Sequence, residues 1–141
     1  MTMRAAIICI GLAACIAGGS LVLAREPDDH SGVSTETLIE QALAGADGTE
    51  VVAQTYLFSP GVVLPWHIHP HAHEIAYVLE GDFTFERAGA PPREMKAGEA
   101  DYLPPNVAHR GLNTSGQPVR LFVVRIKPKD TPLVEDVSPP E

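Results

Sequence analysis

A dense run of histidines is the feature of this sequence most able to do chemistry. Five of the six histidines lie between residues 67 and 109, and four of them fall within residues 67–73, directly before Glu74. In an extended strand side chains alternate between faces, so His67 and His69 point to the same side and can share one ion. Pro70 ends the strand, and Glu74 begins a new one from which its carboxylate can reach the same ion. A histidine-rich surface tract that collects metal adventitiously would have a similar composition, and the spacing is what favours a built site.

A further ligand has to come from another part of the chain, and His109 is the candidate. It follows two prolines and Asn106, a combination typical of a tight turn that delivers a side chain onto the next strand. Asparagine at position 106 suits a left-handed backbone conformation. A single histidine is more often a core or surface residue than a ligand, so at this point both interpretations of His109 stay open.

Short strands are the elements that must position these side chains. Runs of β-branched and aromatic residues alternate with glycine and proline, which predicts an all-β sandwich or barrel. The predicted strands are Glu50–Phe58, Val62–Ile68, Glu74–Leu79, Asp82–Glu86, Tyr102–Leu103, Val107–Leu112 and Val119–Ile126. The segment Thr35–Leu43 fits either a short helix capped by Ser34 or a first strand.

Two motifs in this sequence resemble those of the cupin superfamily. The first is a glycine, five residues, His-x-His, a further carboxylate and a closing glycine, matched by Gly61, His67, His69, Glu74 and Gly81. The second is matched by Gly98, Pro104, Asn106, His109 and Asn113, with asparagine at 106 where the family has glycine. That departure is mild, because asparagine is the side chain that best tolerates positive φ. The resemblance covers about residues 35–127.

The resemblance implies a jelly-roll barrel, also called a double-stranded β-helix, in which Thr35–Leu43 is a strand. It implies one divalent transition metal, Fe, Mn, Ni, Cu or Zn, bound by His67, His69, Glu74 and His109. Glu74 could instead detach and act catalytically as a general base. Three neutral imidazoles and one carboxylate leave a net charge of about +1 around a divalent ion, which attracts an anionic or enolisable molecule.

Two functions are compatible with such a site. The first is a metal-dependent enzyme acting on a small oxygenated organic molecule, either a dioxygenase-like oxidoreductase or an isomerase. The second is a non-catalytic envelope module that binds or stores a metal or a metal-bound ligand. The aromatic residues Tyr56, Trp66, Tyr77 and Tyr102 could line the pocket, although jelly-roll aromatics are more often plain core.

Strand alternation also predicts an exposed apolar row. If Glu74 points inward, then Ala76 and Val78 do too, and residues 75, 77 and 79 point outward as Ile, Tyr and Leu. An outward apolar row predicts a homodimer that covers it, and the alternative is that the N-terminal segment covers it. His71 and His73 lie in the connection between ligands, where we expect supporting or surface roles.

The ends of the chain differ in composition from the middle. Residues 1–24 are predicted to be a secretory signal cleaved after Ala24, with lipidation at Cys15 or an uncleaved membrane anchor as alternatives, so we expect an exported protein, periplasmic or secreted. Both cysteines, Cys9 and Cys15, lie in that segment. Residues 25–34 are expected to be a flexible linker. Residues 128–141, rich in proline and acids, are expected to be a loosely ordered tail; closure of its acids over the barrel mouth is the less favoured alternative.

The net charge of −8 argues against nucleic acid or an anionic membrane as a partner.

Overall fold

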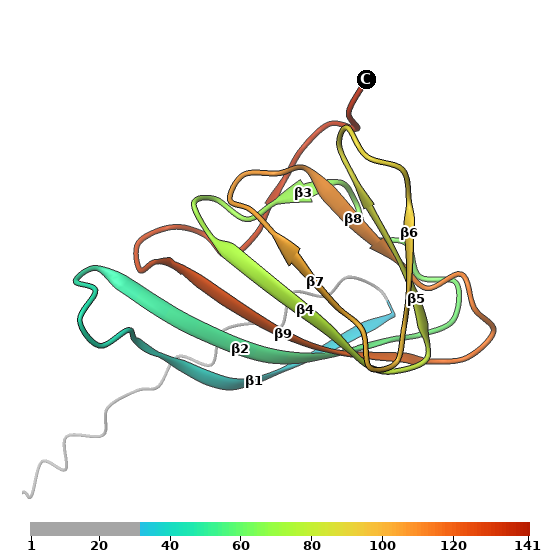
Figure 1. The fold of residues 1–141 in the computed structure, drawn as a ribbon, viewed down its shortest axis with the longest axis horizontal. Helices are drawn as coiled ribbons and strands as arrows, with labels where there is room; N and C mark the ends of the chain where they lie inside the picture. The colour runs from blue at the N-terminus through green and yellow to red at the C-terminus, as the bar shows by residue number, and fades with distance from the viewer. Residues whose placement is uncertain (1–31) are drawn as a thin grey trace, which may run out of the picture.

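Strands are the regular elements in the part of the chain that the structure, a computed structural model, describes, residues 32–141. They form two five-stranded sheets (Figure 1). In spatial order, sheet A contains β1 (Val33–Ala42), β2 (Thr49–Phe58), β9 (Val119–Pro128), β4 (His73–Glu80) and β7 (Ala100–Leu103). Sheet B contains β10 (Glu135–Asp136), β3 (His67–Ile68), β8 (His109–Leu112), β5 (Asp82–Arg87) and β6 (Arg93–Lys96). The neighbouring strands pair antiparallel, and the expected all-β jelly roll is confirmed.

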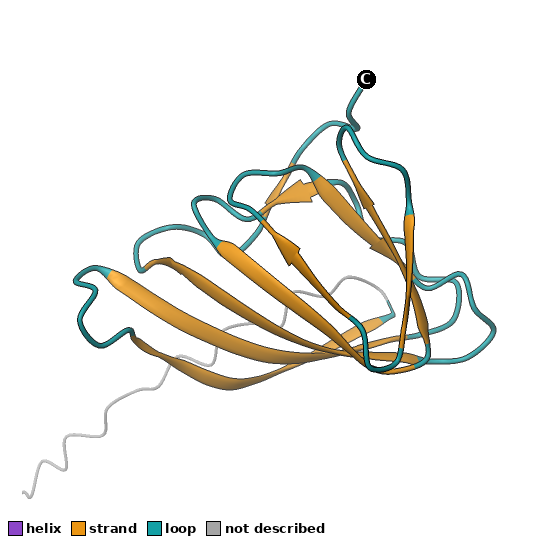
Figure 2. Ribbon diagram, viewed as in Figure 1, coloured by secondary structure: helices purple, strands orange, loops and turns teal. Residues whose placement is uncertain are grey.

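The strand order brings distant parts of the chain together, as Figure 2 shows for the two facing layers. Strand β9 lies between β2 and β4, and β8 lies between β3 and β5. Segments from before and after residue 100 are therefore neighbours within each sheet. This arrangement places the histidine-rich segment of β3 directly beside the start of β8, where His109 stands.

Most predicted strands are observed, and the departures have local causes. Residues 33–42 form a strand, as the family resemblance implies, so the helix alternative is wrong. Of the predicted run Val62–Ile68 only the last two residues are a strand, because Pro65 cannot donate a hydrogen bond to a ladder. Val63 still makes an isolated bridge to Leu112. Strand β6 was not predicted, since its four residues are mostly charged and only Met95 is buried.

The inner surface changes from apolar to polar along β2 and β9. Figure 1 shows the sheets converging where β2 ends and β9 begins, and the hydrophobic core fills this end. Its buried members are Phe58, Ala76, Val78, Phe83, Phe85, Met95, Val119, Leu121 and Val123. Further along the same two strands Gln54, Arg125 and Lys127 are buried beside Val52 and Ala53. The buried histidines and Glu74 lie where these two environments meet.

The outer face of β4 carries the apolar row that alternation predicts. Ile75, Tyr77 and Leu79 are 38–50% exposed, whereas Ala76 and Val78 are buried. Each apolar outward residue alternates with an inward one, so the row is a consequence of the register that points Glu74 inward.

The C-terminal segment is ordered against sheet B, and the expectation of a loosely ordered tail is wrong for residues 133–137. Strand β10 pairs with β3, with Asp136 opposite His67. The Leu133 side chain is 8% exposed. A single buried leucine and backbone pairing hold this segment, and neither signal stands out among the prolines and acids around it.

The predictions for the first 31 residues lie outside the described part of the chain. These are the signal segment, its two cysteines and most of the linker. The linker was expected to extend to residue 34, but strand β1 already begins at Val33. Within residues 32–141 no helix is long and apolar enough to cross a membrane.

Candidate metal centre

Three histidines predicted as ligands meet inside the barrel. His67 opens β3, His69 follows that strand, and His109 opens β8 directly opposite His67. The ring centroids are 4.2 Å apart for His67 and His109, 4.9 Å for His69 and His109, and 5.1 Å for His67 and His69. One nitrogen of each ring lies within 4.8 Å of the other two, and all three residues are buried. This spacing allows the three side chains to hold one metal ion.

Each ring is oriented by a hydrogen bond from its Nδ1. His67 and His109 each donate to the backbone carbonyl two residues earlier in the chain, both at 2.9 Å. His69 donates to the carbonyl of Leu133 at 2.6 Å. A carbonyl oxygen only accepts, so Nδ1 carries the hydrogen in all three rings. In a neutral ring this leaves the Nε2 lone pair free, the arrangement that supports metal ligation.

The Nε2 atom of His69 shows most directly that the site fits a cation. It is buried and has no hydrogen-bond partner among the described residues. Oε2 of Glu74 lies 2.8 Å away, but the contact lacks hydrogen-bond geometry. A lone pair and a carboxylate oxygen at this separation repel each other unless a cation or a proton lies with them. The donor set, three imidazole nitrogens beside a carboxylate, suits a divalent transition metal.

Burial keeps two of the rings in the form that binds metal. Desolvation lowers the pKa of His67 to about 3, with His109 as a second cause. Desolvation also lowers the pKa of His109 to about 4, against the opposing effect of Glu74. Both rings are therefore neutral at pH 7, and a metal need not displace protons from them.

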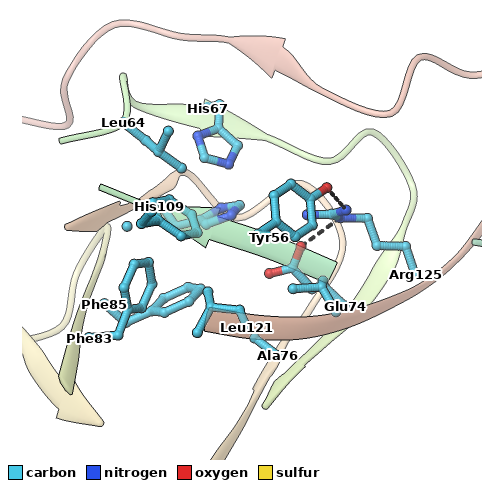
Figure 3. Close-up of a pocket in the computed structure, with 13 residues that line it drawn as sticks. Tyr56, Leu64, His67, Glu74, Ala76, Phe83, Phe85, His109, Leu121 and Arg125 are labelled. Atoms are coloured by element: carbon cyan, nitrogen blue, oxygen red, sulfur yellow. Dashed lines mark hydrogen bonds and ion pairs between the residues drawn. The ribbon is translucent and has the colours of Figure 1, made fainter. Parts of the chain in front are cut away.

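Glu74 is held by a buried arginine. The two residues face each other across the β4 and β9 pair, and Arg125 Nε donates to Glu74 Oε2 at 2.7 Å (Figure 3). Burial alone would raise the pKa of Glu74, but Arg125 and then His69 outweigh it and hold that pKa below its ordinary value. Arg125 Nη1 donates to Gln54 Oε1 at 3.0 Å and to the Tyr56 hydroxyl at 2.7 Å. Glu74 is thus an ionised carboxylate at the edge of the histidine cluster.

The predicted site and the observed one differ mainly in Arg125. Sequence reasoning grouped Glu74 with the three histidines as a ligand; the structure places it beside His69 and pairs it with Arg125, and its ligand role stays a prediction. A signal for Arg125 was present in the alternation of β9, since Leu121 and Val123 point inward and residue 125 has the same parity. A charged residue at a core position of a strand indicates a buried partner.

A small cavity lies beside the histidine cluster. Its empty volume is about 350 Å³, part of it open to solvent. His67, His109, Glu74, Tyr56 and Arg125 form its polar side, as Figure 3 shows. The apolar part of the lining includes Leu64, Phe83, Phe85 and Leu121. The mixed lining, polar in one part and apolar in another, suits a small organic molecule with one polar end.

Other aromatic and histidine residues lie away from the cavity. Of the four aromatics considered as lining, Tyr56 alone lines it; Tyr77 and Tyr102 are exposed, and Trp66 packs under the Arg110 guanidinium. His71 and His73 are both exposed, as expected. His71 has a positive φ of 56° and donates its backbone N–H to Asn106 Oδ1.

Comparison with known proteins agrees with this architecture. Residues 54–125 match the model of a family described as Cupin domain. No curated protein matches the sequence.

Several solved structures are similar in fold. A cupin-like protein from Thermotoga maritima shares 27% sequence identity with a TM-score of 0.55, over 75% of this chain and 76% of that one. The DMSP lyase DddQ from Ruegeria pomeroyi shares 24% identity with a TM-score of 0.62, over 78% of this chain and 54% of that one. An oxalate oxidase in complex with the substrate analogue glycolate shares 24% identity with a TM-score of 0.59, over 86% of this chain and 66% of that one. At such identities the last two comparisons carry the fold alone, and this chain spans about half the length of the DMSP lyase.

Proposed function

This chain belongs to the cupin domain family, and we propose that it binds one divalent transition metal through His67, His69 and His109 and acts there on a small oxygenated organic molecule. The observation that supports this most is the set of three Nδ1 hydrogen bonds to carbonyls, which leaves three Nε2 lone pairs for one ion. The buried Nε2 of His69, without a hydrogen-bond partner among the described residues, is the sharpest part of that set. Fe, Mn, Ni, Cu and Zn all suit these ligands.

Glu74 has two possible roles in this proposal, and the same ion pair supports both. Arg125 keeps the carboxylate ionised and holds Oε2, while Oε1 has no hydrogen bond from the described residues. Glu74 can therefore complete the metal's ligand set, or accept a proton from a bound molecule at Oε1. When bound, the metal would polarise an oxygen of that molecule as a Lewis acid or would activate the molecule toward O2.

The cavity indicates which molecules can reach the site. Three neutral imidazoles and one carboxylate would leave a net charge of about +1 around a divalent ion, which favours an anionic or enolisable group, and the apolar part of the lining covers a short hydrocarbon part. A phenol, a diketone or an enediol has this character. Similar folds are found in a lyase and in an oxidase, which supports chemistry on small oxygenated molecules without choosing the reaction.

Export to the periplasm or the medium completes the proposal and rests on the sequence of residues 1–24 alone. The mature protein would meet its small-molecule ligand there, with membrane contact only through the N-terminal segment if that segment is retained or lipidated. The net charge of −8 argues against nucleic acid as a partner.

The test is turnover by protein loaded separately with each of the five metals. Oxygen uptake is measured with catechols, flavonols and diketones, and solvent deuterium exchange into the same compounds is followed in parallel. We expect one metal to support oxygen uptake or exchange with at least one compound, and His109→Ala to abolish it. Bound metal with neither reaction for any compound would favour the non-catalytic binding module. Absence of metal binding would refute both forms of the proposal.

A further inference from the structure

The three histidines of the metal centre are oriented in two different ways. His67 and His109 donate to carbonyls two residues away, so their own strands fix them. His69 donates to the carbonyl of Leu133, a residue 64 positions later in the chain, through the shortest of the three hydrogen bonds at 2.6 Å. The orientation of His69 therefore depends on the C-terminal segment, which does not orient the other two histidines.

That segment, residues 133–137, is here called the C-terminal strap. It is held by the buried side chain of Leu133, by the pairing of the two-residue strand β10 with β3, and by a hydrogen bond from Val137 N–H to the Trp66 carbonyl at 2.9 Å. The side chains of Glu135 and Asp136 are exposed. Pairing this short at the edge of a sheet has a low free energy of local opening.

We propose that the strap is a working part of the metal centre and that its docking and metal binding stabilise each other. When it is docked, the Leu133 carbonyl holds the hydrogen of His69 on Nδ1 and aims Nε2 at the other two histidines. When it opens, His69 loses this acceptor and can rotate or move its hydrogen to Nε2, which removes a ligand. Leu133 is in this sense a positioning residue, and its buried side chain anchors the carbonyl that acts.

Thermodynamic linkage makes the coupling reciprocal. If the docked strap strengthens metal binding by some factor, bound metal stabilises the docked strap by the same factor. Partners of metal-ligating histidines typically change metal affinity by about 10–100-fold when lost. Metal should therefore slow the opening of the strap to a similar extent.

The first test measures Co²⁺ affinity and the visible Co²⁺ spectrum of the full chain. Leu133→Ser removes the apolar anchor, and we expect Co²⁺ to bind about 10–100-fold more weakly with an altered ligand-field spectrum. Leu133→Met keeps an apolar anchor and should restore both. Glu135→Ala, at an exposed position in the same strap, is the matched control and should behave as wild type. An affinity of Leu133→Ser within about twofold of wild type, with an unchanged spectrum, overturns the proposal.

The second test needs no substitution and so does not depend on a variant folding. Amide hydrogen exchange at Val137 is measured in wild-type protein with and without saturating Zn²⁺. We expect exchange of this amide to slow by about 10–100-fold with Zn²⁺, because metal stabilises the docked strap. Equal rates with and without bound Zn²⁺ overturn the coupling.

This inference rests on the proposed metal site, and the two can fail separately. Wild-type protein that binds neither Co²⁺ nor Zn²⁺ overturns both. Wild-type protein that binds metal with the same affinity as Leu133→Ser overturns the role of the strap and leaves the metal site standing.

Discussion

Charge balance around Glu74 is the main residue-scale property of the site. The Glu74 and Arg125 side chains are 3% and 7% exposed. Among the described residues, neither side chain has another hydrogen-bond partner that carries a permanent opposite charge. Burial disfavours both charges, so the pair persists because each compensates the other. A bound metal would add a second cation next to Glu74. Replacement of Arg125 would then reduce the free energy of unfolding by a smaller amount.

Replacement of Arg125 by Met tests this balance. In metal-free protein it leaves Glu74 buried without compensation, and we expect a loss of about 3–5 kcal/mol in the free energy of unfolding. With metal bound the loss should be smaller, because the ion faces the same carboxylate. Urea denaturation with and without Zn²⁺ measures both values. An equal loss in the two states would show that Glu74 does not interact with the metal.

The stability of metal-free protein should fall in weak acid. Burial lowers the pKa of His67 to about 3 and of His109 to about 4, both below the ordinary value of 6.5. The unfolded chain therefore binds more protons as the pH falls, and the stability present above pH 6.5 is lost between about pH 6.5 and 4 for His109 and down to about pH 3 for His67. Between pH 7 and 5 the two residues together account for about 4 kcal/mol.

Urea denaturation of chelator-treated protein at several pH values measures this loss. His67→Asn removes one of the two groups and should reduce the dependence by about half. Replacing the exposed His71 by Ala should leave it unchanged. A flat profile between pH 7 and 5 would contradict the burial of neutral imidazoles.

Sequence reasoning found the histidines at this scale because their spacing is local, and it missed the groups that support them. The pair His67 and His69 follows from strand alternation, and the positive φ expected of Asn106 is observed at 62°. The Leu133 carbonyl could not be found, because any residue can offer a backbone carbonyl. Arg125 could have been found from its parity on β9.

At the scale of elements, the pairing of strands positions the side chains of the site. Sheet pairing sets His67 opposite His109 and Glu74 opposite Arg125, so two ladders place four of the functional side chains. The sequence indicated these strands through alternation but not their neighbours, since pairing between distant strands depends on the packing of the whole chain. The short β10 carries no periodic signal of its own, which is why its docking on β3 was not predicted.

Gly111 on β8 is a packing constraint at the wall of the cavity. A Cβ at this position would come within 2.3 Å of the Phe83 ring, which is itself 2% exposed. We expect Gly111→Ala to destabilise the protein by about 1–3 kcal/mol through this overpacking. Gly116→Ala, where an added Cβ meets nothing within 4 Å, is the matched control. Thermal unfolding of the two variants compares them, and equal stability would mean that Phe83 moves freely.

At the scale of the whole molecule, the outer face of sheet A is the feature that single-chain packing does not explain. Ile75 and Tyr102 are each 50% exposed on neighbouring strands, and Tyr77 and Leu79 continue the row. We predict that this face is the interface of a homodimer, as the register of β4 indicates. Coverage by the N-terminal segment is the alternative.

Light scattering at micromolar concentration tests the dimer. Wild-type protein should have twice the mass of the chain, and the double substitution Ile75→Lys, Tyr77→Lys should give a monomer. Val63→Lys is the control, because Val63 is equally exposed at 51% but bridges Leu112 of the other sheet. A wild-type monomer with residues 1–24 removed would contradict the prediction.

The position of the bound ion tests the central claim most directly. Crystals of Zn²⁺-loaded protein should give one strong anomalous peak per chain, about 2.0–2.1 Å from the Nε2 atoms of His67, His69 and His109. A peak at exposed histidines such as His71, or a bond to any Nδ1 of the three, would contradict the account.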